Sequence, residues 1–108
     1  QDTVITNLNQ MAYKVNKDSL TTQKKYETRV DFILKKDSII EKNWYDVVYK
    51  IEKNIGVSNT DMGKVDSYYC KDPEGGYCFV HFFEKRKENK NLTVMISYKD
   101  INYYYFSN

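Results

Sequence analysis

Residues 70–78 have the sequence CKDPEGGYC and separate two aromatic-rich, strand-like segments. The pairs Asp72-Pro73 and Gly75-Gly76 favour turns, so they predict a tight connection between two antiparallel strands. In such a hairpin Cys70 and Cys78 face each other, and directly opposed residues have Cβ atoms close enough for a disulfide. We expect a Cys70–Cys78 disulfide. Two free buried thiols, a redox pair and a metal site are the alternatives.

This hairpin belongs to a longer series of predicted strands. They are expected at residues 65–70, 77–83, 92–98 and 101–106, with short polar connections between them. In the third strand, Leu92, Val94 and Ile96 alternate with Thr93, Met95 and Ser97, which is the period of a half-buried strand. Consecutive strands joined in this way form an antiparallel meander.

The first half of the chain has apolar residues at helical spacing. Residues 38–41 match the S-x-x-E capping box, and apolar residues follow at helical intervals as far as Gly56, with Trp44 as an expected core anchor. The apolar positions from Val4 to Val15 also form a helical face. Residues 20–34 fit a further helix, with a strand over residues 29–34 as the alternative.

These patterns predict a single α+β domain over residues 1–108, helical in residues 3–56 and a β meander in residues 65–106. A length of 108 residues suits one domain with one hydrophobic core. We expect the N-terminal helices to pack on a curved antiparallel sheet of three to four strands.

Charge and hydropathy limit the classes of partner. Seventeen Lys and Arg nearly balance fifteen Asp and Glu, and the two signs are interleaved, so no basic stripe for nucleic acid is expected. No stretch of about 18 uncharged apolar residues is present, so no membrane span is expected. The sequence begins at Gln1 without Met. Together with the expected disulfide, this predicts an extracytoplasmic protein, either periplasmic, secreted or lipid-anchored, whose export signal has been removed.

The sequence has no recognisable catalytic or cofactor motif. Its four glycines lie outside the patterns of phosphate-binding loops, and no nucleophile elbow is present. His81 is the one histidine, so a zinc site would need carboxylate ligands whose spacing is not seen. We therefore expect no catalytic residues, no cofactor and no metal site.

Aromatic residues supply the candidate binding surface. Tyr77, Phe79 and His81 fall on one side of their predicted strand while Cys78 and Val80 fall on the other, so both sides are apolar. Such a sheet can enclose a pocket or contact a partner. The candidate ligand or partner surface comprises Tyr68, Tyr77, His81, Tyr103 and Tyr105.

Aromatic richness without a catalytic set predicts a non-catalytic binding or protein-interaction domain. Its partner would be an unknown protein or small-molecule ligand, and the sequence leaves homo-oligomerisation open. The alternative is a small pocket-type enzyme, in which an acid or His81 acts beside a Tyr hydroxyl as general acid or base.

The order of several short motifs resembles small bacterial cystatin-like or nuclear-transport-factor-like domains. These motifs are Asn43-Trp44-Tyr45, Ile55-Gly56, the turn at residues 72–77 and the aromatic strands that follow. The resemblance implies a curved antiparallel sheet wrapped on helices and an exported bacterial protein of uncharacterised function. It implies no catalytic residues, and the Gln-x-Val-x-Gly inhibitory loop of true cystatins is absent.

Overall fold

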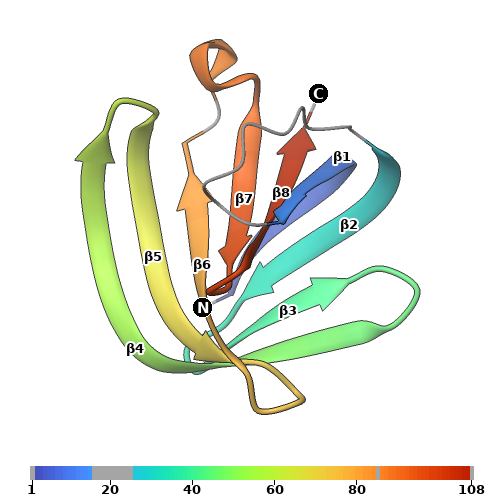
Figure 1. Cartoon of the computed structure of the whole chain (residues 1–108), viewed down its shortest axis with the longest axis vertical. Helices are drawn as coiled ribbons and strands as arrows, with labels where there is room; N and C mark the ends of the chain where they lie inside the picture. Colours follow the sequence, from blue (N-terminus) through green and yellow to red (C-terminus); the bar gives the residue numbers. More distant parts are fainter. Residues whose placement is uncertain (1, 16–25, 85, 108) are drawn as a thin grey trace.

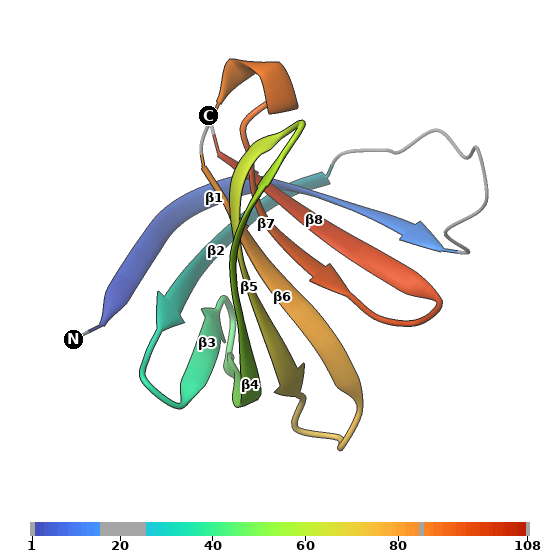
Figure 2. The same cartoon turned by 90° about the vertical axis from the view of Figure 1, so that its left-hand side faces the viewer.

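The chain folds into a closed barrel of eight antiparallel strands (Figures 1 and 2). The computed structural model describes residues 2–15, 26–84 and 86–107. Each strand pairs with the next along the chain, and β1 also pairs with β8, which closes the barrel. The elements are β1 (Thr3–Val15), β2 (Tyr26–Leu34), β3 (Ser38–Lys42), β4 (Asp46–Thr60), β5 (Gly63–Lys71), β6 (Tyr77–Phe83), the 3₁₀ helix η1 (Lys87–Asn89), β7 (Leu92–Ser97) and β8 (Ile101–Ser107).

The α+β prediction is wrong, because the first half of the chain forms strands instead of helices. The segments expected to be helical form strands β1 to β4 and the turns between them; residues 16–25 lie outside the described residues. The alternative of a strand over residues 29–34 is confirmed by β2. The expected resemblance to cystatin-like or nuclear-transport-factor-like domains is also wrong, because those folds pack helices on an open sheet.

Irregularities in β1 explain the helical spacing of its apolar residues. The register of β1 shifts between Ile5 and Leu8 and again between Leu8 and Gln10, and Asn7 there has a φ of +60°. A bulge inserts an extra residue, so inward-facing side chains are no longer two residues apart. Apolar residues separated by three or four positions then resemble a helical face. In β4 the register shifts lie only beyond Ile51. Before them, residues two positions apart pack on the main core, namely Val47, Tyr49 and Ile51.

The predicted capping box and core anchor have different roles in the barrel. Ser38 and Glu41 both lie in β3, where Ile39 and Glu41 are buried on the inner face. Trp44 lies in the turn between β3 and β4 and is 98% exposed, so it is not a core anchor. The S-x-x-E pattern does not mark the start of a helix here, because Ile39 and Ile40 within it, like the two valines near the start of β4, are β-branched and favour strands.

The strands predicted for the second half are present as β5 to β8. The turn between β5 and β6 is organised by Asp72, whose side chain accepts hydrogen bonds from the backbone N–H groups of Glu74 (3.0 Å) and Gly76 (2.8 Å). Gly75 has a φ of +90°, a conformation that glycine adopts without a steric penalty. The Asp-Pro and Gly-Gly pairs therefore form the expected turn.

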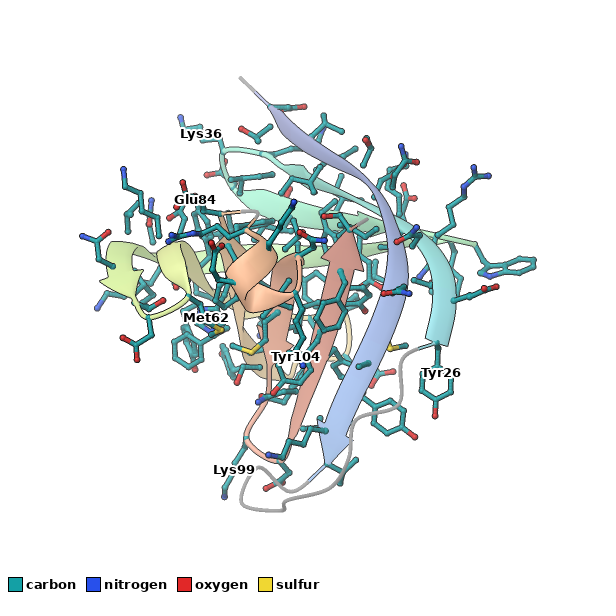
Figure 3. The ribbon with its side chains drawn as sticks, turned by 90° about the horizontal axis from the view of Figure 1, so that it is seen from above. Tyr26, Lys36, Met62, Glu84, Lys99 and Tyr104 are labelled. Carbon is teal, nitrogen blue, oxygen red and sulfur yellow. The ribbon has the colours of Figure 1, made fainter. Side chains whose placement is uncertain are left out.

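The core lies inside the barrel, because alternate residues of every strand point inward. Two buried clusters are formed, while side chains such as Tyr26 and Lys36 point outward (Figure 3). A smaller cluster next to the β6–β7 connection lies on the outer face, because Phe83 is on the same side of β6 as His81 and is paired with Val65. This cluster consists of Ala12, Val65, Phe83, Leu92 and Phe106. The main cluster comprises Leu8, Val30, Phe32, Ile39, Tyr49, Tyr68, Cys70, Cys78, Val80, Val94, Ile96 and Tyr105.

Candidate binding pocket

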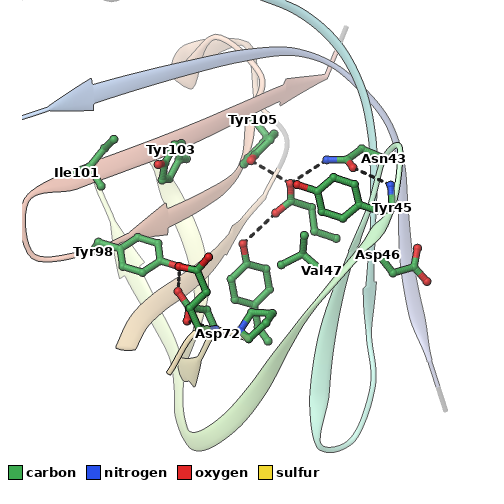
Figure 4. Close-up of a pocket in the computed structure, with 13 residues that line it drawn as sticks. Asn43, Tyr45, Asp46, Val47, Asp72, Tyr98, Ile101, Tyr103 and Tyr105 are labelled. Atoms are coloured by element: carbon green, nitrogen blue, oxygen red, sulfur yellow. Dashed lines mark hydrogen bonds between the residues drawn. The ribbon is translucent and has the colours of Figure 1, made fainter. Parts of the chain in front are cut away.

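A pocket of about 660 Å³ occupies the part of the barrel next to the β3–β4, β5–β6 and β7–β8 turns (Figure 4). Its volume falls in the range of small-molecule sites, and an eight-stranded barrel is wide enough to hold one small ligand. The lining residues are Glu41, Asn43, Tyr45, Asp46, Val47, Tyr49, Asp72, Pro73, Glu74, Tyr98, Ile101, Tyr103 and Tyr105.

Glu41 is the buried polar group of this pocket. It lies on the inner face of β3, only 7% exposed, and is paired with Phe32 of β2 and Val47 of β4. Its carboxyl group accepts hydrogen bonds from the hydroxyls of Tyr49 (3.0 Å) and Tyr105 (3.3 Å). The side-chain amide of Asn43 donates a third bond of 3.3 Å. A buried carboxyl group is tolerated here because several donors surround it.

Burial dominates the electrostatics of this group. Loss of water raises the pKa of Glu41 above its usual value, although the bonds from Tyr49 and Tyr105 partly oppose the shift. Burial also raises the pKa of Tyr49 and Tyr105, and the neighbouring Glu41 carboxylate raises both further. Both tyrosines are therefore neutral hydroxyls that donate to Glu41 at neutral pH.

A second carboxylate lies in the β5–β6 turn. The hydroxyl of Tyr98 donates to Asp72 Oδ2 at 2.7 Å (Figure 4). This bond holds the pKa of Asp72 below its usual value, with further help from the turn's backbone N–H groups. Burial raises the pKa of Tyr98, and its bond to Asp72 adds to the shift. Asp72 is therefore an ionised carboxylate at the wall of the pocket.

The charged groups of the lining have one sign. Among the described residues, the lining includes the acids Glu41, Asp46, Asp72 and Glu74 and no Lys, Arg or His. Asp46 forms an exposed ion pair with Lys42 at 3.7 Å, so its charge is partly balanced. The lining therefore combines carboxyl groups with five tyrosines, which are Tyr45, Tyr49, Tyr98, Tyr103 and Tyr105.

The structure separates the predicted surface residues into three places. Tyr103 and Tyr105 line the pocket. Tyr68 is buried in the core and donates to Asp66 at 2.8 Å, and burial followed by this bond raises its pKa to about 12. Tyr77 and His81 alternate with the buried Cys78 and Val80, so they lie on the outer face of β6. The five residues do not form one surface.

Aromatic rings form a continuous row on the outer face of β5 and β6. Tyr69 stacks on Tyr77 with a centroid separation of 5.5 Å, and Phe79 follows at 5.0 Å from Tyr69. Phe79 and His81 are stacked at 6.1 Å. The Nδ1 atom of His81 lies 2.8 Å from the hydroxyl of Ser67, a short hydrogen bond. This row is separate from the pocket, because none of these residues lines it.

The functional residues that sequence reasoning missed are Glu41, Tyr49, Asp72 and Tyr98. Glu41 was assigned to a helix cap, and Asp72 was assigned only to a turn. One signal could have identified Glu41: within a strand it lies two residues from Ile39, so an acid shares a face with an apolar residue. Acids are seldom buried unless other groups bind them, so an acid on an inward-facing strand position indicates a buried polar site.

The predicted opposition of the two cysteines is correct, but their expected disulfide is not present. Cys70 and Cys78 are directly paired across β5 and β6, and both are buried free thiols. Burial raises the pKa of Cys70 to about 12 and that of Cys78 to about 11. One of the alternatives, two free buried thiols, is therefore what the structure contains. The extracytoplasmic location stays a prediction, now without a disulfide to support it.

Searches for metal ligands and for membrane-spanning helices were negative over the described residues. No group of three His, Cys, Asp or Glu side chains there is arranged to hold a metal ion. None of the helical structure in that part of the chain is long and apolar enough to cross a membrane. Comparison with protein-family models, curated proteins and solved structures finds no match to this chain.

Proposed function

We propose that this protein is a non-catalytic binding protein that holds one small molecule inside its barrel. The observation that carries the proposal is the pocket of about 660 Å³, with Glu41 buried in its wall. A ligand of this site would be surrounded by tyrosine rings and would meet a few fixed polar groups, which is the usual composition of small-molecule sites.

The rigidity of the lining supports binding. Tyr49, Tyr98 and Tyr105 are each anchored through their hydroxyls to a carboxyl group, at 2.7 to 3.3 Å. Tyr49 and Tyr105 are each 6% exposed and pack in the main core cluster. Rings held in this way lose little conformational entropy when a ligand binds, which favours affinity.

A pocket-type enzyme built on His81 has less support. His81 lies on the outer face of the barrel beside Ser67 and does not line the pocket. Two acids that could act beside a Tyr hydroxyl in such an enzyme, Asp100 and Glu84, do not line the pocket either. Glu41 beside two Tyr hydroxyls is the one arrangement that favours acid–base chemistry. Both hydroxyl protons are directed at Glu41 instead of the pocket, which favours binding over proton transfer to a ligand.

A neutral fluorescent dye tests the proposal without knowledge of the natural ligand. N-phenyl-1-naphthylamine, whose emission rises in an apolar site, would be titrated into the wild type and two Trp variants. Val47→Trp fills the pocket, because Val47 lines it. Val48→Trp is the matched control, because the next residue of β4 is 45% exposed on the opposite face. Far-ultraviolet circular dichroism would establish that both variants fold.

We expect saturable binding of one dye molecule per chain in the wild type and in Val48→Trp, and loss of binding in Val47→Trp. Ile101→Trp, at the pocket's other wall, would repeat the result if Val47→Trp failed to fold. Absence of binding in the wild type, or equal binding in folded pocket variants and the control, would refute the proposal.

A further inference from the structure

Hydrogen-bond direction makes three of the pocket's five tyrosines acceptors toward a ligand. The hydroxyls of Tyr49 and Tyr105 give their protons to Glu41, and the hydroxyl of Tyr98 gives its proton to Asp72. A hydroxyl has one proton and two lone pairs. Each of these oxygens therefore has only lone pairs left for a ligand, and the carboxylates are acceptors as well. A molecule that donates hydrogen bonds fits this arrangement better than one that accepts them.

The charge of the lining also favours a ligand that donates hydrogen bonds. Within the described part of the chain, four carboxyl groups line the pocket and no basic side chain does. Glu41 accepts three hydrogen bonds, whereas a carboxylate has about four acceptor positions. One position is therefore open to a ligand. A carboxylate in this environment has no cationic partner among the groups that bond to it, so a bound cation would supply the missing countercharge.

The tyrosine rings add a third element of recognition. Five tyrosines line the pocket, and the face of an aromatic ring attracts a cation within about 6 Å of its centroid. This attraction is stronger in a desolvated site than at an exposed surface. The tyrosine faces thus favour an organic ammonium group over a hydrated inorganic ion, because such an ion is coordinated by oxygen atoms and gains little from a ring face. Among the described residues, no group of three His, Cys, Asp or Glu is arranged to hold a metal ion.

We infer that the ligand of this pocket is an organic amine, with its ammonium group bound at the Glu41 carboxylate and its apolar part against the tyrosine rings. The inference rests on the proposed function and narrows its ligand to one chemical class. The pocket would accommodate an aromatic or aliphatic body attached to a primary amine. Carboxylate and phosphate ligands would be rejected, because they would bring a second negative charge to Glu41 and Asp72.

Three indoles of similar size test the inference, because they differ mainly in the charge of the group at the end of the side chain. Tryptamine has an ammonium group, tryptophol a hydroxyl group and indole-3-propionate a carboxylate. Their affinities would be measured by isothermal titration calorimetry at about pH 8, where a primary amine is protonated. Dye binding by N-phenyl-1-naphthylamine would be recorded on the same protein, so that the pocket itself is tested separately.

We expect tryptamine to bind about tenfold or more tightly than tryptophol, and indole-3-propionate to bind most weakly. In Glu41→Gln the ratio of tryptamine to tryptophol affinity should fall close to one. Glu41→Asp keeps the charge on a shorter side chain and should retain part of the preference. Reading the ratio within each variant separates loss of the charge from general damage to the pocket.

Three results would contradict the account, and each would overturn a different part of it. Dye binding with equal affinity for tryptamine and tryptophol would overturn the amine inference and leave the proposed function standing. A preference for tryptamine that persists in Glu41→Gln would overturn the placement of the ammonium group at Glu41. Absence of binding by the dye and by all three indoles would overturn the proposed function as well.

Discussion

At the residue scale, stability should depend on pH through the buried carboxyl group of Glu41. Burial raises its native pKa above the ordinary value of 4.5. Between that value and the raised pKa the native state binds more protons than the unfolded chain, so the free energy of unfolding falls as pH rises. Glu41→Gln removes this pH dependence, because a Gln side chain does not titrate. The variant should therefore gain stability relative to the wild type as pH rises through the window.

Urea unfolding at a series of pH values measures this difference. Below pH 4.5 Glu41 is protonated in both states and makes no contribution. Asp72 acts in a separate window: its pKa is lowered, mainly by Tyr98, so its stabilisation is present above pH 3.8 and is lost on further acidification. An identical pH slope in Glu41→Gln and wild type above pH 4.5 would contradict the burial of this group.

Trp44 provides a second test at the residue scale. It is the one tryptophan of the chain and is 98% exposed in the β3–β4 turn. Trp44→Ala should therefore change the free energy of unfolding by no more than about 0.5 kcal/mol. Equilibrium denaturation followed by circular dichroism would measure it. A loss of about 3 kcal/mol or more, typical of a buried Trp, would mean that Trp44 belongs to the core.

The two cysteines should be unreactive in the native protein. Thiolates are the reactive species, and burial raises the pKa of Cys70 to about 12 and that of Cys78 to about 11. Alkylation by iodoacetamide, followed by intact mass, should be about a hundredfold slower in native protein than in urea. In urea without reductant, two adducts per chain are expected. Failure to label the unfolded chain would show that the thiols are oxidised.

At the scale of the element, the bulges of β1 and β4 determine the curvature of the barrel. Residues 46–50 of β4 pair with β3, and from Lys50 onward the strand pairs with β5. The strand must bend to make both sets of contacts, and its register shifts lie just beyond this change of partner. Gly56 lies at the second shift with a φ of +100°.

Gly56→Ala should destabilise the protein by about 1–2 kcal/mol through backbone conformation alone. A Cβ atom at this position would meet nothing within 4 Å, so a steric clash does not contribute. Ser58→Ala, on the same strand and exposed, is the control. Urea denaturation would measure both variants, and an unchanged midpoint for Gly56→Ala would show that the bulge needs no left-handed residue.

The bulges of β1 explain in part which elements were predictable. The four strands of the second half were evident because β7 alternates over residues 94–97, beyond its register shift after Leu92, and because Asp-Pro and Gly-Gly mark the turn between β5 and β6. In β1 the extra residues interrupt the alternation, so a strand pattern approximated a helical one. In β4 the exposed Val48 lies beside the inward Val47, so apolar residues on both faces had the same effect. β-Branched residues in β4, such as Val47 and Ile51, were the remaining evidence for a strand.

At the scale of the whole molecule, the pocket follows from closure of the barrel. Glu41 comes from β3 and Tyr49 from the next strand, β4, whereas Tyr105 comes from β8, which lies far from both in the sequence. No local pattern indicates that they meet. Tyr103 and Tyr105 were predicted as surface residues and do line the pocket, but the bond of Tyr105 to Glu41 could be found only once the pairing of β1 with β8 was known.

A crystal structure of the protein with bound tryptamine tests the central claim most directly. We predict one molecule inside the barrel, with its ammonium nitrogen at a hydrogen-bond distance of about 2.7–3.2 Å from the Glu41 carboxylate and its indole against the tyrosine rings. A barrel interior closed by side chains, or tryptamine bound only to the outer aromatic row of β5 and β6, would contradict the account.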